Sequence, residues 1–141
     1  NIAHELGVSD RVHMLGHVPT DDLPRWYNAC NVFAMPNREI NGDNEGFGMV
    51  FIEAASCGKP AIAGIAGGTG AAVLEGVSGL RVDGNSVEAV AQGLVKLLLN
   101  REEAEKMGHH GWSRTQAEFA WEKVAEKTLA LSLKMMRSDI T

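Results

Sequence analysis

The chain has little of what marks several common classes of protein. Among its 141 residues there are only two cysteines, Cys30 and Cys57, and neither has a second cysteine or a histidine at metal-ligand spacing. This pattern favours buried free thiols over a disulfide and predicts that no metal is bound. No apolar run approaches the roughly 20 residues of a membrane span, and the N-terminus does not look like a signal peptide. We therefore expect a soluble, cytoplasmic protein without a transmembrane segment.

Runs of positive charge are also missing. Lysine and arginine number 13 against 18 acidic residues, giving a net charge of -5, and no basic patch indicates a nucleic-acid partner. The length corresponds to one domain with a sizeable core. The chain opens on Asn1, within what resembles the end of a helix closed by Gly7. We thus expect residues 1–141 to be a single partial domain of a longer protein.

Short apolar runs alternate with helical patterns in the first part of the chain. Strands are predicted at 11–15, 31–35, 60–63 and 79–82, and helices at 21–29, capped by Thr20, and from just after Glu45. Such alternation predicts an α/β fold with a Rossmann-like parallel sheet flanked by helices. From Ser86 onward the pattern is all helical, with helices at 87–98, 101–118 and 121–136. Helical spacing beside apolar neighbours places the three tryptophans in the core, namely Trp26, Trp112 and Trp121.

The most informative segment reads E-G-F-G-M-V-F-I-E from Glu45 to Glu53. Glycines 46 and 48 let backbone amides approach a ligand, and the start of a helix favours an anion such as phosphate. Carboxylates accept hydrogen bonds from vicinal hydroxyls. On a regular helix the two acids lie about 12 Å apart, the scale of a nucleotide sugar. Equally, Glu45 can be a helix-start acid and Glu53 a solvated side chain.

Three loops follow predicted strands and so lie at the sheet edge where open α/β sheets bind ligands. The glycine-rich stretch 64–70 lacks the residues of a P-loop, and a tight turn explains it equally well. Arg38, in the polar loop 37–44, is a candidate contact for phosphate or acceptor, although an arginine that is simply solvated at the surface is the alternative. His17 follows Gly16, where backbone atoms could meet a nucleobase; a bystander role is the alternative.

Several motifs occur in an order typical of one family. They are Leu15-Gly16, Asp22-Leu23 to Tyr27, Met35-Pro36, E-G-F-G to Glu53, Ala54-Ala55-Ser56-Cys57-Gly58-Lys59-Pro60, Gly67-Gly68, Gly79-Leu80 and Phe119-Ala120-Trp121-Glu122. This order resembles the C-terminal, nucleotide-sugar-binding domain of the family 4 glycosyltransferases of the GT-B fold. The phosphatidylinositol mannosyltransferase-like branch is the most similar. The resemblance covers nearly the whole chain, and the carboxylate pair with its flanking motifs is its most specific part.

The resemblance implies a hexosyltransferase that moves a sugar from a nucleoside diphosphate donor to an acceptor hydroxyl, with retention and without a metal or other cofactor. Glu45 would be the catalytic carboxylate near the reacting centre. The donor would also meet Gly46, the backbone of Phe47, Gly48 and Met49, the carboxylate of Glu53 at the ribose, Gly16 and His17 at the base, and Arg38.

Two departures from the family pattern limit this expectation. No acid follows the Gly67-Gly68 pair closely, so the contact made by that acid is lost. The family's basic pair for the diphosphate and its acceptor-binding N-terminal domain would lie upstream of Asn1. We therefore expect this fragment to bind donor weakly and to transfer nothing alone, with peripheral membrane association possible for the full-length protein. The alternatives are a non-catalytic nucleotide-sugar-binding module acting with a partner chain, and a domain whose cleft has no function.

Overall fold

A computed structural model describes residues 2–138, and its centre is a parallel sheet. Within those residues the sheet has three strands in the order β1-β2-β3, with β1 at Phe33–Met35, β2 at Ala61–Gly64 and β3 at Gly79–Val82. All neighbours are parallel, with Ile62 between Ala34 and Leu80. The predicted parallel α/β architecture is confirmed, and three of the predicted strands are present.

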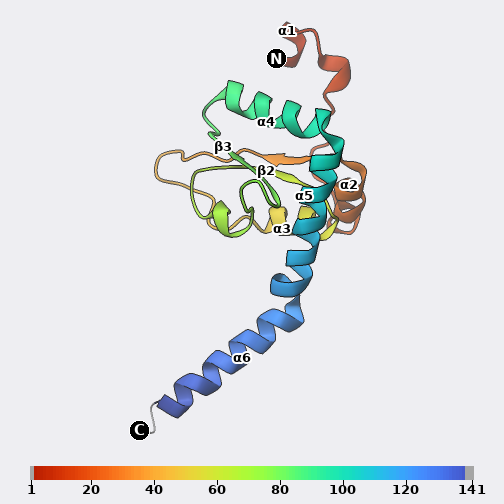
Figure 1. The fold of residues 1–141 in the computed structure, drawn as a ribbon. Coiled ribbons are helices and arrows are strands. Elements are labelled where there is room, and N and C mark those ends of the chain that lie inside the picture. The colour runs from red at the N-terminus through yellow and green to blue at the C-terminus, as the bar shows by residue number, and fades with distance from the viewer. Residues whose placement is uncertain (1, 139–141) are drawn as a thin grey trace.

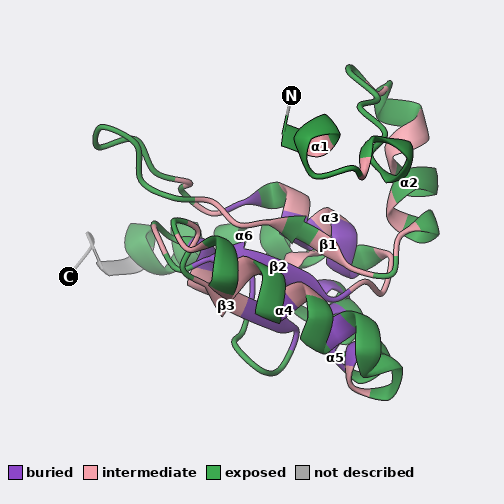
Figure 2. Cartoon of the chain, turned by 90° about the horizontal axis from the view of Figure 1, so that it is seen from above, coloured by how far each residue is buried: buried purple, intermediate pink, exposed green. Residues whose placement is uncertain are grey.

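Helices cover both faces of this sheet because side chains alternate along β2. Ala61 and Ala63 pack with Phe51 of α3 (Met49–Ser56) in one buried cluster. Ile62 points the other way and packs with Leu97 of α4 (Val87–Leu99) in a second cluster, which α5 (Arg101–Arg114) completes. Figure 1 shows β2 between these helices, and Figure 2 shows the buried positions gathered along it. The small residues of β2 let both layers approach closely.

The strand predicted at 11–15 is wrong. The described chain begins with α1 (Ile2–Glu5) and a 3-10 turn η1 (Ser9–Arg11), and residues 12–15 then run in irregular structure. Met14 is 91% exposed, and none of the three strands pairs with this segment. A strand needs a hydrogen-bonded neighbour, so an apolar run without one does not form a ladder.

The helix after this segment also begins differently from the prediction. Residues Thr20–Asp22 form a 3-10 turn, η2, and α2 spans Leu23–Ala29 with Pro24 in its first turn. Its N-cap residue is Asp22, and no side chain caps it, so the predicted cap by Thr20 is wrong. Proline fits the first turn of a helix because it lacks the amide that would stay unbonded there.

The C-terminal part is helical, as predicted. Helix α5 passes through a π-helical turn, η4 (Thr115–Phe119), into α6 (Trp121–Ser138), which extends away from the sheet (Figure 1). The predicted burial of the tryptophans is wrong, because Trp26, Trp112 and Trp121 are 49%, 43% and 79% exposed. Helical spacing shows that residues share a face, but only a neighbouring element can bury that face.

The apolar side chains of α4 are only partly covered. Leu97 is buried, whereas Val87 and Leu98 are exposed. The two cysteines are free thiols, as predicted, but they are half-buried rather than buried. Burial is the main cause that raises the pKa of the Cys30 thiol.

Candidate functional site

The loops that follow β1 and β2 are joined at the carboxyl edge of the sheet. The side chain of Asn37 donates to the carbonyl of Ala66 at 2.9 Å and accepts from the amide of Gly64 at 2.8 Å. One side chain thus ties the loop after β1 to the glycine-rich loop after β2. Sequence reasoning missed Asn37, although an amide residue directly after a strand end is a signal that could have identified it.

The glycine pair at 67 and 68 lies directly against Glu45 and Gly46. The amide of Gly68 donates to the carbonyl of Glu45 at 3.0 Å. A Cβ at Gly67 would lie 2.1 Å from the carbonyl oxygen of Glu45, and one at Gly68 would lie 1.8 Å from that of Gly46. No side chain fits at either position, so the two loops meet backbone to backbone.

Helix α3 begins at the same place, but later than predicted. Gly48 is its N-cap residue with φ +83 and ψ 67, in the left-handed region, and the first helical residue is Met49. Because this left-handed residue separates Glu45 from the helix, the spacing of about 12 Å expected for one regular helix does not apply. No side chain caps this helix start, and Met49 is 55% exposed. The amide of Phe51 donates to the carbonyl of Gly48 at 2.9 Å, and within residues 2–138 the amides of Met49 and Val50 have no acceptor. The site thus holds two free helix-start amides near a half-buried carboxylate, Glu45.

The side chain of Phe47 anchors this loop to the C-terminal segment. Its ring lies 5.6 Å from that of Phe119, over which the guanidinium of Arg114 is stacked at 4.8 Å. Arg114 also donates to the carbonyls of Ala71 and Ala72, at 2.8 and 3.2 Å. Sequence reasoning missed Arg114, because nothing in its spacing shows that it reaches a segment more than forty residues earlier. The ring of Phe47 is thereby turned inward, which leaves the backbone of Gly46 at the surface.

Glu53 lies further along α3 and has a tyrosine as its partner. The hydroxyl of Tyr27 on α2 donates to Oε2 of Glu53 at 2.8 Å. Burial, and then the hydrogen bond to this carboxylate, raise the pKa of Tyr27 well above its usual value. Both residues line a pocket of about 250 Å³, whose other walls are Thr20, Leu23, Pro24, Ser56 and Cys57.

The structure does not bring Gly16 and His17 into contact with the two glutamates. Gly16 has a φ of +66 and open space around its α-carbon, and His17 is exposed. Their loop does lead to Thr20, which lines the pocket of Glu53.

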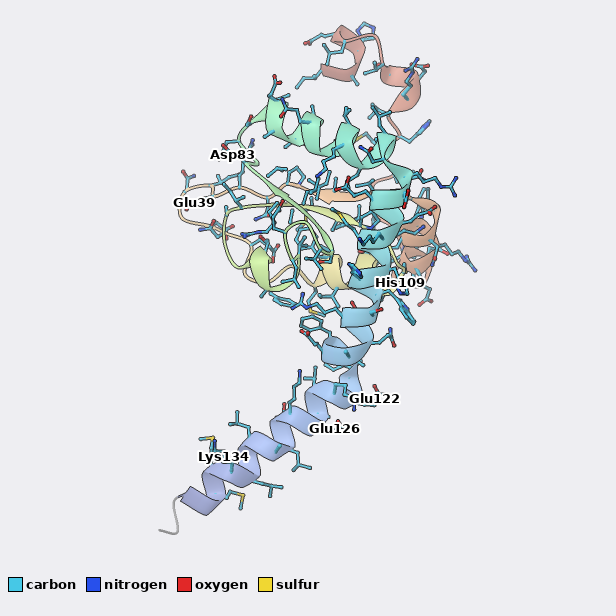
Figure 3. The ribbon with its side chains drawn as sticks, viewed as in Figure 1. Glu39, Asp83, His109, Glu122, Glu126 and Lys134 are labelled. Carbon is cyan, nitrogen blue, oxygen red and sulfur yellow. The ribbon has the colours of Figure 1, made fainter. Side chains whose placement is uncertain are left out.

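Arg38 is exposed on the loop that leaves β1. Asn41 and Gly42, with φ of 54 and 84, form a left-handed turn that closes this loop between Ile40 and Asp43. Figure 3 shows Glu39 at its outer end, away from the helices. Within residues 2–138, no carboxylate forms an ion pair with Arg38, so its guanidinium is available to an anion.

Among residues 2–138, no group of three or more histidine, cysteine, aspartate or glutamate side chains is arranged to hold a metal ion. No helix in this range is both long and apolar enough to span a membrane.

The chain is similar in sequence to known glycosyltransferases. Residues 1–114 match the family model of the glycosyl transferases group 1. The chain is 42% identical over 128 residues to the GDP-mannose-dependent alpha-(1-6)-phosphatidylinositol monomannoside mannosyltransferase of Mycobacterium tuberculosis H37Rv. That alignment covers 89% of this chain and 33% of the relative, so the chain spans about a third of the relative's length.

Solved structures show the same fold. The sucrose-phosphate synthase of Thermosynechococcus elongatus matches with a TM-score of 0.82 and 31% identity, over 97% of this chain and 33% of that one. The Anabaena protein HepE, solved in complex with UDP, matches with a TM-score of 0.81 and 25% identity, over 94% of this chain and 35% of that one. These neighbours are GT-B glycosyltransferases, so the predicted fold class is confirmed.

Proposed function

The chain belongs to the glycosyl transferases group 1, and on that premise we propose that it is the donor-binding part of a retaining hexosyltransferase. The donor is a nucleoside diphosphate sugar, and the acceptor is a hydroxyl group. The chain spans about a third of its curated relative, and our proposal assigns acceptor binding to a part of the protein outside these residues.

The observation that carries this proposal is the contact between the Gly67-Gly68 pair and the backbone of Glu45 and Gly46. The 3.0 Å hydrogen bond from the amide of Gly68 to the backbone carbonyl of Glu45 fixes the backbone of this residue just before the uncapped start of α3. Free amides at a helix start favour the negative charge of a diphosphate, and a carboxylate accepts hydrogen bonds from sugar hydroxyls. A glycosylated pyrophosphate carries both groups next to each other.

Each part of the donor has a candidate partner. Glu45 holds the sugar hydroxyls near the reacting carbon, and the backbone of residues 46–49 faces the sugar and the diphosphate. As the bond to the sugar breaks, charge grows on the departing diphosphate, where the helix start and Arg38 stabilise it. This assignment requires no metal and no other cofactor. The acid that the family often has just after its glycine pair has no counterpart here, since residues 69–73 contain none.

The nucleoside belongs at Glu53, which accepts hydrogen bonds from the ribose hydroxyls. Support comes from the pocket of about 250 Å³ that Glu53 shares with Thr20, at the end of the loop carrying Gly16 and His17. HepE was solved with UDP, whereas the mycobacterial relative is GDP-mannose-dependent, so tests of donor binding need both nucleotides. The cytoplasmic location, the membrane association of the full-length protein and the inactivity of this fragment stay predictions.

A substitution at Glu45 in the full-length protein tests the proposal. We expect Glu45→Gln to lower turnover by about 100-fold or more, because a stabilising charge at the reacting centre is lost. Glu122→Gln makes the same change on α6, far from the sheet (Figure 3), and is the matched control. Near-normal turnover of Glu45→Gln contradicts the catalytic assignment. Donor binding without any transfer by the wild-type full-length protein supports the alternative, a non-catalytic binding module.

A further inference from the structure

Tyr27, the only tyrosine of the chain, is held in place by aromatic neighbours. Its ring packs edge-on against Phe33 of β1, with centroids 5.5 Å apart and planes at 68°. Phe33 in turn packs against Phe51 of α3 at 5.8 Å and 74°. This aromatic ladder links α2, β1 and α3, so the phenol hydroxyl is presented to Glu53 from a fixed position.

The hydrogen bond occupies one side of the Glu53 carboxylate. Tyr27 donates to Oε2 at 2.8 Å, and within residues 2–138 no hydrogen bond reaches Oε1. Apart from Glu53 itself, the pocket side chains include no carboxylate, lysine or arginine, so no charged neighbour competes for this carboxylate. Burial and the carboxylate both raise the pKa of Tyr27, so the phenol remains a donor at every physiological pH.

From this geometry we propose that Tyr27 is a positioning residue for the donor site. It holds the Glu53 carboxylate through Oε2 and leaves Oε1 to accept a hydrogen bond from a ribose hydroxyl. This inference rests on the proposed function, which places the ribose at Glu53. A carboxylate already fixed in one rotamer loses less side-chain entropy when the ligand arrives, so its bond to the hydroxyl gains affinity.

A double-mutant cycle on the 141-residue chain tests the coupling between the two residues. Calorimetric titration with UDP and with GDP gives the Kd of the wild type, Tyr27→Phe, Glu53→Ala and the double variant. We expect Tyr27→Phe to weaken binding by about 2- to 10-fold, the effect of having to fix one side chain on binding, and to have no further effect once Glu53 is alanine. Trp26→Phe, an exposed aromatic change on the same helix, should leave Kd within about twofold.

The ribose hydroxyls themselves supply a readout that a merely structural role of Tyr27 would not move. Nucleoside diphosphates lacking the 2′ and 3′ hydroxyls should bind the wild type more weakly. Their affinity for Tyr27→Phe should equal their affinity for the wild type, because the contact that Tyr27 supports is absent from these complexes. A loss at Tyr27→Phe of equal size for both kinds of nucleotide overturns the positioning role.

The outcomes separate this inference from the function on which it rests. If the wild type binds neither UDP nor GDP, or if Glu53→Ala leaves Kd unchanged, the ribose assignment fails and the inference with it. If Glu53→Ala weakens binding while Tyr27→Phe does not, or if the two losses add, only the inference fails.

A spectroscopic measurement covers the case in which Tyr27→Phe does not fold. Ultraviolet titration follows the ionisation of the single tyrosine in the wild type and in Glu53→Ala. Removing the carboxylate should lower the pKa of Tyr27, because the hydrogen bond and the charge that raise it are gone. Coincident titration curves overturn the proposed contact.

Discussion

Gly68→Ala should damage the fold and the donor site together. The new Cβ would lie 1.8 Å from the carbonyl oxygen of Gly46, whereas real Cβ atoms essentially never come within 3.0 Å of another heavy atom. One of the two loops must therefore move by roughly 1.2 Å, since the atoms of Gly46 that the new Cβ meets all belong to the backbone and not to a flexible side chain. That shift also strains the 3.0 Å hydrogen bond between the amide of Gly68 and the carbonyl of Glu45.

Overpacking of this kind costs about 1–3 kcal/mol in the free energy of unfolding. For a chain of this size the loss corresponds to a Tm lower by about 4–12 °C. Urea denaturation, monitored by circular dichroism, measures the free energy of unfolding. Calorimetric titration with UDP and GDP measures the effect on donor binding. We expect the Kd to rise by about 10-fold or more, because a displacement near 1 Å misaligns the binding groups.

Gly46→Ala is the matched control, because a Cβ at this position has nothing within 4 Å. It should leave the stability of the fold within about 0.5 kcal/mol of the wild type. It should nevertheless weaken donor binding, since the added methyl group occupies the space in front of the backbone where we place the ligand. If Gly68→Ala has the same free energy of unfolding and the same nucleotide Kd as the wild type, the described contact between the loops is refuted.

Three further predictions concern stability. Ile62→Ala, at a fully buried site on β2, should lower the free energy of unfolding by about 2–5 kcal/mol in urea titrations; a loss under 1 kcal/mol contradicts the described core. Asn37→Ala should cost about 1–3 kcal/mol, because it breaks both hydrogen bonds between the loops; an unchanged urea midpoint speaks against that tie. The folded-state pKa of Tyr27 is raised above 10.0, so its contribution to stability is full below about pH 10 and is lost as the pH rises further. Tyr27→Phe should flatten this alkaline decline in a pH series of urea midpoints, and a decline identical to the wild type's refutes the assignment.

The hydrophobic pattern of the sequence predicted correctly those strands that have a neighbouring strand to pair with. The run Pro60-Ala61-Ile62-Ala63 predicted a buried strand, and β2 is buried on both faces. The run at 11–15, in which Arg11 and His13 alternate with apolar residues, was also predicted as a strand, yet no strand of the sheet pairs with it and it forms none. Periodicity predicts which residues share a face, but it does not predict what covers the face, and Trp121 at 79% exposure illustrates this.

The candidate site was predictable as a segment but not as a set of contacts. E-G-F-G to Glu53 identified the segment, because glycines and acids beside a helix start have a specific chemistry. The contacts of Gly68 with Gly46 and of Tyr27 with Glu53 join residues more than twenty positions apart. Such pairs depend on how the layers pack, so sequence spacing contains no signal for them. Phe47 illustrates the same limit, since its ring packs on Phe119, more than seventy residues later in the chain.

An NMR titration of the 15N-labelled chain with UDP and with GDP tests the central claim most directly. If the donor lies across the two loops and the start of α3, the shifted amides will cluster at 45–53 and 66–70. A cluster elsewhere, for example on the exposed face of α4, or no shifts with either nucleotide, contradicts the account.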